Sequence, residues 1–547
     1  MEISVGDLLT RAGAACAAAE RYVLAARQAC RHRIAGGDAR ALDIEQRALH
    51  GFSWIATLVQ SLEAARQWAA RLQAGDGLAP IDALVLRIGF GEYLAQLVYA
   101  LPMSQNELAR PTDLGIADAA RALADDAAAA WFLVEGNNAA TRAALTALIE
   151  ADARPSEALG DETLDMIRAQ FRAFAAQRIA PKAHDWHLAD ALIPIEIVDE
   201  MADLGVFGIC IDAEYGGLGL GKLAMCVVSE ELSRGWICAG SLGTRSEIAG
   251  ELIGESGTPA QKAYWLPRLA RGETLPTAVF TEPDVGSDLA SLKTRAVRDG
   301  DGWSVTGAKN WITHAARADL MTLLVRTNPA EPGHAGLSML LAAKTRGTEE
   351  DAFPDEGLAG SEIEVLGYRG MREYALSFDG FRVPGDAILG GEEGKGFRQL
   401  MRTFEGARIQ TAARAIGVGW NAFDVALDYA RTRRQFGCAL ADFPRVADKL
   451  ALMLVELVMA RELTYAAARR KDEGRRCDIE AGMAKLLAAR VAWANADATV
   501  QIHGGNGYAL EYQASRILCD ARILNIFEGA AEIQAHVVAR GLLSAAN

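Results

Sequence analysis

A series of short apolar and β-branched runs interrupts an otherwise helical sequence between about residues 277 and 391. It includes Trp303-Ser304-Val305-Thr306 and Leu337-Ser338-Met339-Leu340-Leu341. Similar runs occur at residues 321–325, 363–365 and 374–378. Gly, Asp and Asn separate the runs, a pattern typical of β-strands joined by turns. We therefore predict an antiparallel β unit in the middle of the chain.

The sequence on both sides of this β unit has helical periodicity. In the first 150 residues, apolar positions such as Ile55, Leu58 and Leu62 recur at helical spacing, and Ala153-Arg154-Pro155-Ser156-Glu157 resembles a linker. Helical patterns resume from about residue 161 and again from about residue 397. The predicted fold is mainly α with a central β domain. Its segments are residues 1–155, 156–276, 277–392 and 393–547.

Composition limits the classes of function. The chain has 547 residues, 51% of them hydrophobic, and a formal net charge of −15. An acidic chain of this size is expected to fold as several domains and not to bind nucleic acid, which requires a clustered basic surface. Eight cysteines without regular spacing, and no signal or membrane-spanning segment, favour a reduced, cytoplasmic protein without membrane insertion.

The segment Ile526-Phe527-Glu528-Gly529 places a carboxylate where an apolar run breaks and a new helix can begin. A carboxylate in apolar surroundings gains proton affinity and can act as a general base. Phe527, with Ile523, Leu524 and Ile526, is expected to supply those surroundings. The structural alternative is a glutamate stabilised by the dipole at a helix N-terminus.

Several further motifs occur in a fixed order along the chain. They are Tyr215-Gly216-Gly217-Leu218-Gly219, Thr281-Glu282-Pro283, Gly286-Ser287-Asp288, Trp311-Ile312-Thr313, Arg433-Arg434-Gln435-Phe436-Gly437, Gln501-Ile502-His503-Gly504-Gly505-Asn506-Gly507-Tyr508 and Phe527-Glu528-Gly529. From residue 161 onward the chain resembles the acyl-CoA dehydrogenases. The resemblance implies an α-helical domain, a central β-barrel or sheet domain and a C-terminal four-helix bundle, with residues 1–155 as an additional helical domain. It also implies FAD as cofactor and α,β-desaturation of an acyl-CoA, with Glu528 as the base.

The resemblance assigns further residues to the cofactor and the substrate. Residues expected to bind FAD are Phe280, Thr281, Gly286, Ser287, Trp311, Ile312, Thr313, Arg433, Phe436, Gln501, Gly505, Ala530 and Glu532. Residues expected to bind the substrate are Thr244, Arg245, Ser287, Arg408, Phe527 and Gly529. The chain departs from the family pattern at Pro444, where a glutamine is common, and at Ala530, where a threonine is usual. An isolated tryptophan such as Trp311 can also belong to a sheet core.

Two positions bear on the reaction and its substrate. Some relatives carry the base at the position of Ala407, and the absence of a carboxylate there favours Glu528. Arg245 lies where relatives line the acyl pocket with small or apolar residues, and a guanidinium matches a carboxylate. We therefore expect a short, branched dicarboxylic acyl-CoA as substrate. The alternative for Arg245 is an internal salt bridge to Glu247 or another acid.

The resemblance also implies partners. Electron-transfer flavoprotein is the expected electron acceptor, and the adenosine half of FAD is held by residues of a neighbouring subunit, so a homodimer is the smallest functional unit. An acyl-CoA oxidase, a short- or medium-chain dehydrogenase and a catalytically silent member of the fold are the alternatives. His184 and His187 lie near Asp185, but without further ligands they predict no metal site.

Overall fold

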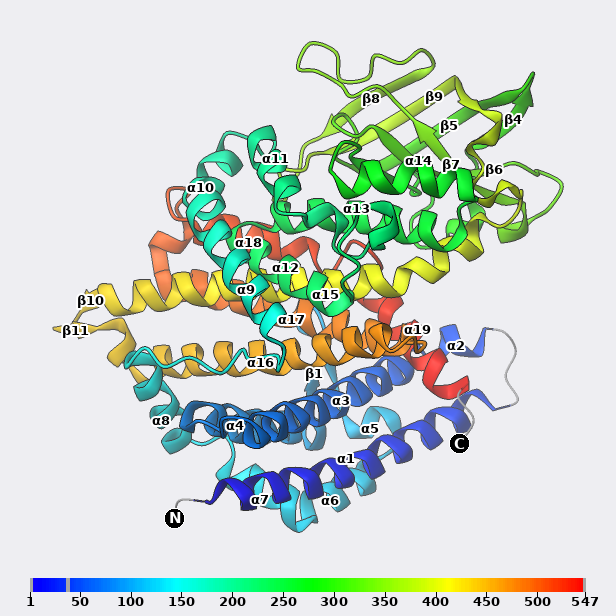
Figure 1. Ribbon diagram of the computed structural model, residues 1–547. Coiled ribbons are helices and arrows are strands. Elements are labelled where there is room, and N and C mark those ends of the chain that lie inside the picture. Colours follow the sequence, from blue (N-terminus) through cyan, green and yellow to red (C-terminus); the bar gives the residue numbers. More distant parts are fainter. Residues whose placement is uncertain (1–2, 36–39, 545–547) are drawn as a thin grey trace. The chain divides into compact units, whose positions relative to one another are not determined.

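The structure is a computed structural model that describes residues 3–35 and 40–544. The chain forms two compact units. The sheet unit comprises Gln170–Gln410, and the helical unit comprises Met1–Ala169 with Thr411–Asn547. Two helices, α9 (Glu162–Phe174) and α15 (Gly396–Thr432), continue from one unit into the other. Figure 1 shows the elements in the order of the sequence.

The sheet unit is built around a seven-stranded sheet. Its strands are β3 (Pro276–Val279), β4 (Arg295–Asp299), β5 (Gly302–Thr313), β6 (Leu320–Arg326), β7 (Leu337–Ala343), β8 (Leu358–Ile363) and β9 (Glu373–Pro384). The strand order is β3-β6-β4-β5-β9-β8, and β7 pairs with β6. A central β domain was predicted, and the fold class is confirmed.

The prediction of an antiparallel unit holds for most strand pairs of this sheet but not for all of them. Strand β6 runs parallel to both β3 and β4, whereas the remaining pairings of this sheet are antiparallel. Strands β3 and β4 are short and are not joined to β6 by a hairpin turn. The sequence therefore contains no turn signal that predicts their direction relative to β6. The predicted strand at residues 363–365 is also displaced, because β8 ends at Ile363.

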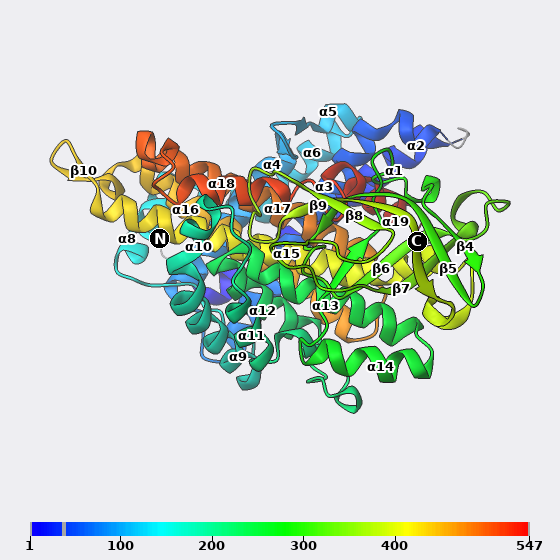
Figure 2. The ribbon, with the colours of Figure 1, turned by 90° about the horizontal axis from the view of Figure 1, so that it is seen from above.

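Side chains alternate between the two faces of the sheet. On β6, Met321, Leu323 and Val325 enter one hydrophobic core, while Leu320 and Leu324 enter another. This second core also contains apolar residues of α13 (Ile237–Ser256) and α14 (Pro259–Ala270), so these helices cover that face. Figure 2 shows both helices beside the strands. The period-two alternation of a strand thus produces a sheet buried on both faces. The other helices of this unit are α10 (Ala180–Leu188), α11 (Ile195–Asp203) and α12 (Lys222–Gly235).

The helical unit joins the two ends of the chain. Its N-terminal helices are α1 (Val5–Ile34), α2 (Ala41–Ile44), α3 (Gln46–Ala74), α4 (Pro80–Val98), α5 (Pro111–Leu114), α6 (Ala117–Asp125), α7 (Ala127–Glu135) and α8 (Ala139–Glu150). Its C-terminal helices are the later part of α15 with α16 (Pro444–Asp472), α17 (Asp478–His503), α18 (Ala514–Ile523) and α19 (Ala531–Ser544). Short hairpins β1–β2 (Leu101–Pro102, Leu108–Ala109) and β10–β11 (Arg434–Gln435, Cys438–Ala439) complete it.

Helix α3 packs against the C-terminal helices α16 and α19. Ser61 donates a hydrogen bond to the carbonyl of Met459 at 3.0 Å, and Ser53 donates one to the carbonyl of Ala535 at 2.5 Å. Gly89 on α4 faces Met459 so closely that a Cβ there would lie 2.7 Å from its sulfur. The N-terminal helices are therefore part of one hydrophobic core with the C-terminal bundle, not an appended segment.

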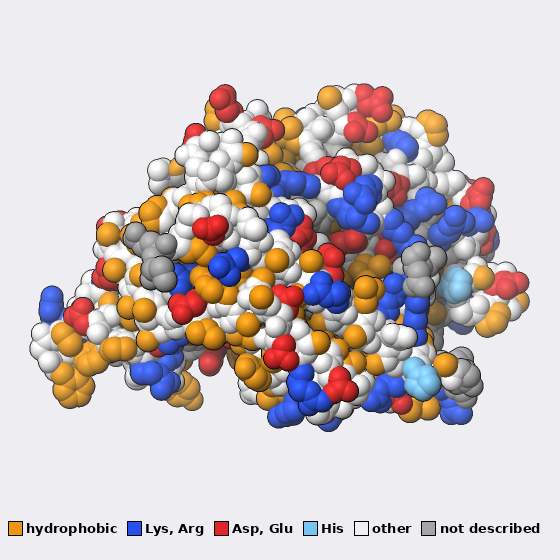
Figure 3. Space-filling view, turned by 90° about the horizontal axis from the view of Figure 1, so that it is seen from below, with side chains coloured by type: hydrophobic (Ala, Val, Ile, Leu, Met, Phe, Trp, Pro, Cys, Tyr) orange, Lys and Arg blue, Asp and Glu red, His pale blue; other side chains and the backbone are white. Residues whose placement is uncertain are grey.

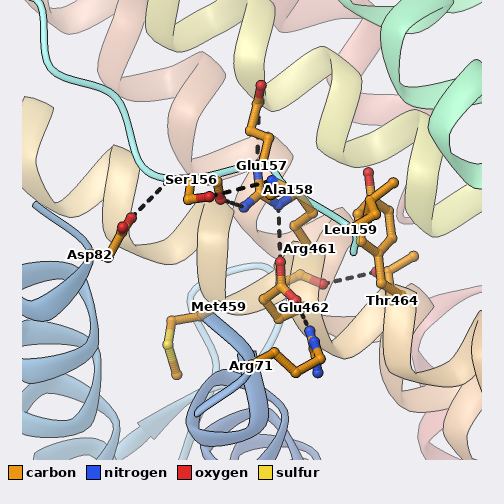
Figure 4. Close-up of polar contacts among 12 residues, drawn as sticks. Arg71, Asp82, Ser156, Glu157, Ala158, Leu159, Met459, Arg461, Glu462 and Thr464 are labelled. Atoms are coloured by element: carbon orange, nitrogen blue, oxygen red, sulfur yellow. Dashed lines mark hydrogen bonds and ion pairs between the residues drawn. The ribbon is translucent and has the colours of Figure 1, made fainter. Parts of the chain in front are cut away.

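Buried charges hold the predicted linker against this core, as Figure 4 shows. The amide of Ser156 donates to Asp82 at 2.7 Å, and the Arg461 guanidinium donates to the Ser156 carbonyl at 3.0 Å. Arg461 is also ion-paired with Glu157 and Glu462, at 3.4 and 3.3 Å. Burial raises the pKa of the Asp82 carboxyl above its usual value. These contacts thus hold the segment after residue 153 against α16.

The eight cysteines, all within the described residues, form no disulfide, and Cys16, Cys30, Cys226, Cys238 and Cys477 are buried. Across the part of the chain that the structure describes, helices that combine the length and the hydrophobicity needed to cross a membrane are absent. Figure 3 shows acidic and basic side chains interspersed on one face of the molecule.

Candidate active site

Several of the predicted FAD-binding residues of the sheet unit lie in or beside a bulge in β5. The register between β5 and β9 shifts between Lys309 and Ile312, so that Asn310 and Trp311 form the bulge. Trp311 has a φ of 59° and is 54% exposed, so it does not belong to the sheet core. A bulge re-aims a side chain out of the strand's alternation. It therefore presents the indole as a free aromatic face.

The loop that carries Phe280 and Thr281 lies beside this bulge. The amide of Asn310 donates to the carbonyl of Thr281 at 2.9 Å, and the Lys309 ammonium donates to the carbonyl of Phe280 at 2.8 Å. Lys309 also pairs with Glu282 at 3.1 Å. One buried cation thus fixes the loop to the strand.

The Glu282 carboxylate is held rigidly. It accepts hydrogen bonds from the backbone amides of Lys293 and Thr294, at 2.7 and 2.8 Å. Burial alone would raise the pKa of Glu282, but Lys309 and these donors outweigh it and hold the pKa below its usual value. Burial lowers the pKa of Lys309 to about 8. The sequence motif identified Glu282 but not its lysine partner.

Thr313 lies at the end of β5 with its hydroxyl already engaged. This hydroxyl donates to the Glu373 carboxylate at 2.8 Å, and its backbone carbonyl accepts from Thr277 at 2.7 Å. Sequence reasoning missed Glu373, which lies 60 residues from Thr313. Ile312 was also predicted to bind FAD, but its side chain is buried in the sheet core, so only its backbone is suited to that role.

Gly286 and Ser287 follow a tight turn formed by Glu282 and Val285, whose backbone groups hydrogen-bond to each other at 2.9 and 3.1 Å. Both Gly286 and Ser287 are exposed. A Cβ at Gly286 would meet nothing within 4 Å, and its φ is not in the left-handed region. The fold itself does not require a glycine here. The residue leaves space for close approach of a ligand such as a phosphate.

The expected acyl-pocket residues lie on α13. Thr244 is fully buried and donates its hydroxyl to the Gly240 carbonyl of the same helix at 3.2 Å. Arg245 is 8% exposed. The suggested partner of Arg245, Glu247, is paired with Lys222 of α12, which also binds Glu251 at 3.0 Å. Lys222 thus engages both Glu247 and Glu251 of α13.

The Phe527-Glu528-Gly529 turn lies between α18 and α19 in the helical unit. Glu528 and Gly529 have φ values of 52° and 93°, so two successive residues occupy the left-handed region. The Gln534 side chain donates to the Glu528 carbonyl at 3.2 Å, and Lys485 donates to the Gly529 carbonyl at 2.6 Å. A side chain at position 529 would collide with Gln534, so the turn requires glycine. Because α19 begins at Ala531, Glu528 precedes this helix and does not lie within it.

The Glu528 carboxylate contacts two polar side chains of α15. Arg414 donates to its Oε2 at 2.5 Å, and the Thr411 hydroxyl donates to the same oxygen. The Glu528 side chain is 14% exposed and that of Arg414 is fully buried. The Arg414 guanidinium also lies 5.0 Å from the centre of the Phe527 ring. The prediction of purely apolar surroundings was therefore incomplete.

Ile526, expected to shield the base, is 51% exposed and does not cover it, whereas Leu524 is buried. Arg414 and Thr411 were not identified from the sequence. They lie 114 and 117 residues from Glu528, a separation that no local motif spans. The sequence offered one signal for Arg414, which is an arginine in an otherwise apolar stretch of helix.

Earlier on α15 are the alternative base position and a predicted substrate contact. Ala407 is buried and carries no carboxylate. Arg408 lies with its guanidinium 5.7 Å from the centre of the Phe404 ring. Its charge is thus supported by an aromatic face on the same helix.

The residues expected to bind the adenosine half of FAD are on the surface of the helical unit. Arg433 and Phe436 are at the β10–β11 hairpin, where Phe436 is 95% exposed with a φ of 53°. Gln501 and Gly505, near the end of α17, are also exposed. A Cβ at Gly505 would meet nothing within 4 Å.

Ala530 and Glu532 flank the start of α19. The carbonyl of Ala530 accepts from the Gln534 amide at 3.0 Å, closing the first turn, and Glu532 is exposed. Pro444 is the first residue of α16, a position that favours proline because its missing N–H would be unpaired there. This accounts for one departure from the family pattern without reference to the cofactor.

The chemistry of both groups of residues fits FAD. An exposed indole, neighbouring threonines and an open glycine turn match a flat ring with a polar edge and a phosphate. When bound, FAD would supply the acceptor for hydride. The exposed Phe436 and the open surface at Gly505 match contacts to a cofactor or subunit outside this chain.

Comparison with known proteins agrees with this arrangement. Models of the acyl-CoA dehydrogenase N-terminal, middle and C-terminal domains match residues 161–273, 277–381 and 394–543. The chain is 59% identical to (2S)-methylsuccinyl-CoA dehydrogenase of Cereibacter sphaeroides, over 98% of this chain and 99% of that protein. It is 36% identical to the mitochondrial short-chain specific acyl-CoA dehydrogenase of Homo sapiens, over 70% of this chain and 90% of that protein.

Solved structures give the same result. Butyryl-CoA dehydrogenase from Megasphaera elsdenii is 30% identical and has a TM-score of 0.66, covering 70% of this chain and 98% of its own. A glutaryl-CoA dehydrogenase from Mycobacterium smegmatis in complex with FADH2 is 29% identical with a TM-score of 0.63, covering 71% of this chain and 96% of its own. The chain belongs to the acyl-CoA dehydrogenase family of FAD-dependent oxidoreductases.

Proposed function

We propose that this acyl-CoA dehydrogenase oxidises (2S)-methylsuccinyl-CoA to mesaconyl-CoA. The main support is the extent of the 59% identity, which continues through the N-terminal helices to 98% of the chain. The short-chain specific relative covers only 70% of the chain. Because the N-terminal helices share a core with the bundle, their presence in both proteins indicates a common variant of the whole fold.

In the proposed reaction, Glu528 removes the proton from the carbon next to the thioester carbonyl. The hydride from the following carbon passes to FAD, which leaves an α,β double bond. The turn at residues 527–529 fixes the position of the carboxylate, and Ala407 offers no competing base. The backbone N–H of Glu528 is our proposed donor to the thioester oxygen, where negative charge develops.

We propose that Arg245, which belongs to the sheet unit, contacts the second carboxylate of the substrate. Its low exposure supports this assignment. Ser287 and Arg408 are proposed to bind the CoA portion, and Phe527 and Gly529 to border the reacting carbons.

The substrate proposal is tested with purified FAD-loaded protein and a panel of acyl-CoA thioesters. We expect kcat/KM for methylsuccinyl-CoA to exceed that for butyryl-CoA by about 100-fold or more, the discrimination expected of a buried charged contact. Equal turnover of the two thioesters would refute the proposal.

We further propose that electrons pass to electron-transfer flavoprotein, in the cytoplasm. An acyl-CoA oxidase with the same base and cofactor is the second candidate. Measuring hydrogen peroxide against reduction of electron-transfer flavoprotein during turnover distinguishes them, because an oxidase releases peroxide in proportion to substrate consumed.

A homodimer is our proposed functional unit. The β10–β11 hairpin exposes Phe436, and Tyr508 and Leu510 near the end of α17 are 90% and 69% exposed. Exposed aromatic residues of this kind are common at interfaces. The N-terminal helices cover one side of α16 and α19, which limits further association there. Light scattering is expected to give a dimer, and a stable tetramer would contradict this proposal.

A further inference from the structure

The turn that carries the proposed base is held in an uncommon conformation by residues outside it. Glu528 and Gly529 both have left-handed φ values, which are unfavourable for a residue with a side chain. The side-chain amide of Gln534 donates to the carbonyl of Glu528 at 3.2 Å and lies 3.5 Å from that of Gly529. Lys485 of α17 donates to the Gly529 carbonyl at 2.6 Å. The position of the turn therefore depends on the positions of α17 and α19.

Helix α19, which carries Gln534, packs against α17 and also against the N-terminal helices α1 and α3. Figure 1 shows α19 beside these N-terminal helices. On the α17 side, the approach is so close that a Cβ at Gly482 would lie 2.9 Å from Cγ2 of Val538. Gln534 and Ala535 are both buried. The N-terminal helices therefore supply part of the surface that fixes α19.

Two polar side chains of the N-terminal helices bind the backbone of α19. The Ser53 hydroxyl, on α3, donates to the carbonyl of Ala535 at 2.5 Å. Ser53 is fully buried, and its hydroxyl also lies 3.1 Å from the carbonyl of Leu49 on its own helix. Arg31, on α1, donates to the carbonyl of Leu543 at 2.9 Å. The N-terminal helices thus hold α19 near its beginning and near its end.

We propose that the N-terminal helices position the base, with Ser53 and Gln534 as positioning residues. Ser53 fixes α19, and Gln534 connects α19 to the backbone of Glu528. Proton transfer requires the carboxylate to lie within about 3 Å of the group that loses the proton, and a displacement of about 1 Å lowers the rate about 100-fold. A contact that fixes the helix therefore affects the reaction without touching the substrate. This inference rests on the proposed role of Glu528 but not on the proposed substrate.

Hydrogen exchange tests the structural part of the inference without using activity. In FAD-loaded Ser53→Ala protein, we expect the backbone amides of residues 526–535 to exchange about 5-fold faster, the effect of one lost buried hydrogen bond on local opening. Ser61→Ala is the matched control, because Ser61 is also a buried serine of α3 but donates to the carbonyl of Met459 on α16 at 3.0 Å. Ser61→Ala should leave the exchange of residues 526–535 unchanged.

Turnover per bound flavin tests the effect on the reaction. Ser53→Ala should lower kcat about 10-fold, because a less firmly placed base reaches the proton less often. The KM should change less than about 2-fold, since the residues proposed to bind the substrate are unaltered. The same factors should apply to 2-methylbutyryl-CoA, in which a methyl group replaces the second carboxylate of methylsuccinyl-CoA. Ser61→Ala should leave kcat and KM for both thioesters unchanged.

Gln534→Met tests the connection between α19 and the turn. Methionine has a similar volume but donates no hydrogen bond, so we expect kcat per bound flavin to fall about 100-fold. Adding Ser53→Ala to Gln534→Met should lower kcat by less than about 2-fold more, because the two residues act in series. If the two substitutions lower kcat independently, the connection through Gln534 is wrong. If Gln534→Met protein does not retain FAD, the comparison of Ser53→Ala with Ser61→Ala still decides the proposal.

The inference and the proposed function fail in different ways. If Glu528→Gln retains turnover, the proposed base is wrong, whatever the hydrogen-exchange measurements give. If Glu528→Gln lacks turnover but Ser53→Ala does not exceed Ser61→Ala in both hydrogen exchange and loss of kcat, the positioning role is refuted and Ser53 contributes to stability alone.

Discussion

The loop at Glu282 and the turn at Glu528 each place a glutamate against a buried cation, but they hold it differently. Glu282 is bound by two backbone amides as well as Lys309. The contacts described for Glu528 come from the side chains of Thr411 and Arg414. Backbone donors belong to the fold and fix a carboxylate in place, whereas side chains can change rotamer. The difference separates a carboxylate that maintains a loop from one that can take part in a reaction.

The largest expected effect comes from replacing each of the two glutamates with glutamine in turn. Glu528→Gln should lower kcat by about 10³-fold or more, the contribution of a positioned general base, while the protein keeps its FAD. Glu282→Gln should act mainly on the cofactor loop and reduce FAD content more than the turnover of each loaded molecule. Turnover is measured per bound flavin. If both variants retain FAD and lose turnover equally, the distinction between the two sites is wrong.

Removing the cation under the cofactor loop should produce the next largest effect. Lys309→Met leaves the buried Glu282 with its backbone donors but without a counter-charge, which is expected to cost about 3 kcal/mol. Thermal unfolding and FAD retention of the loaded protein measure this change.

Lys293→Met is the matched control for Lys309→Met. The Lys293 side chain is 78% exposed in its pair with Asp284, and its loss should change stability by less than about 0.5 kcal/mol. Equal effects of the two substitutions would show that the loop does not depend on the buried pair.

His314, directly after Thr313, should make the sheet unit sensitive to acid. It is fully buried, and burial together with Arg317, Arg346 and Arg245 lowers its pKa to about 3. The unfolded chain, with a pKa near 6.5, binds a proton there that the native protein does not. Stability is therefore fully present above about pH 6.5 and declines as the pH falls toward 3, by about 3 kcal/mol at pH 4.

Replacing His314 should remove this pH dependence. His314→Asn suits the position because asparagine tolerates its φ of 64°. The comparison is the slope of stability against pH between 4 and 7, not the stability at one pH. His334→Asn, at an exposed histidine, should leave the slope unchanged. An unaltered slope in His314→Asn would assign the acid sensitivity to other groups.

The sequence predicted residues that lie within contiguous motifs, and it missed their distant partners. Glu528, Trp311 and Thr281 could be identified because motif residues surround each of them. Arg414 and Glu373 could not be identified, because their contacts to Glu528 and Thr313 join residues that are 114 and 60 positions apart in the sequence.

The prediction of strand direction failed for the same physical reason. The alternating residues of β6 indicate a strand, yet nothing local shows that β3 and β4 lie parallel to it. Periodicity reports which face of an element is buried. The partner that buries it is selected by the packing of the whole chain.

The smallest expected effect concerns Arg461, a buried arginine that holds the linker and is remote in role from the reaction. Arg461→Met keeps the volume but loses the hydrogen bond to Ser156 and the pairs with Glu157 and Glu462. Glu462 keeps Arg71 as a partner at 3.0 Å, so the cost should be limited to about 1–2 kcal/mol.

Arg461→Met should therefore release the linker without lowering turnover per bound flavin. Limited proteolysis should cut near residues 153–160 about 10-fold faster. A decrease of about 1.4 kcal/mol in the free energy of local opening raises the population of the open state tenfold. Arg475→Met, at an exposed pair with Glu473, should leave the cleavage rate unchanged. If Arg461→Met also changed the ratio of methylsuccinyl-CoA to 2-methylbutyryl-CoA turnover, a buried arginine with a purely structural contact would be enough to alter specificity. The contrast between structural and reactive charges in this fold would then fail.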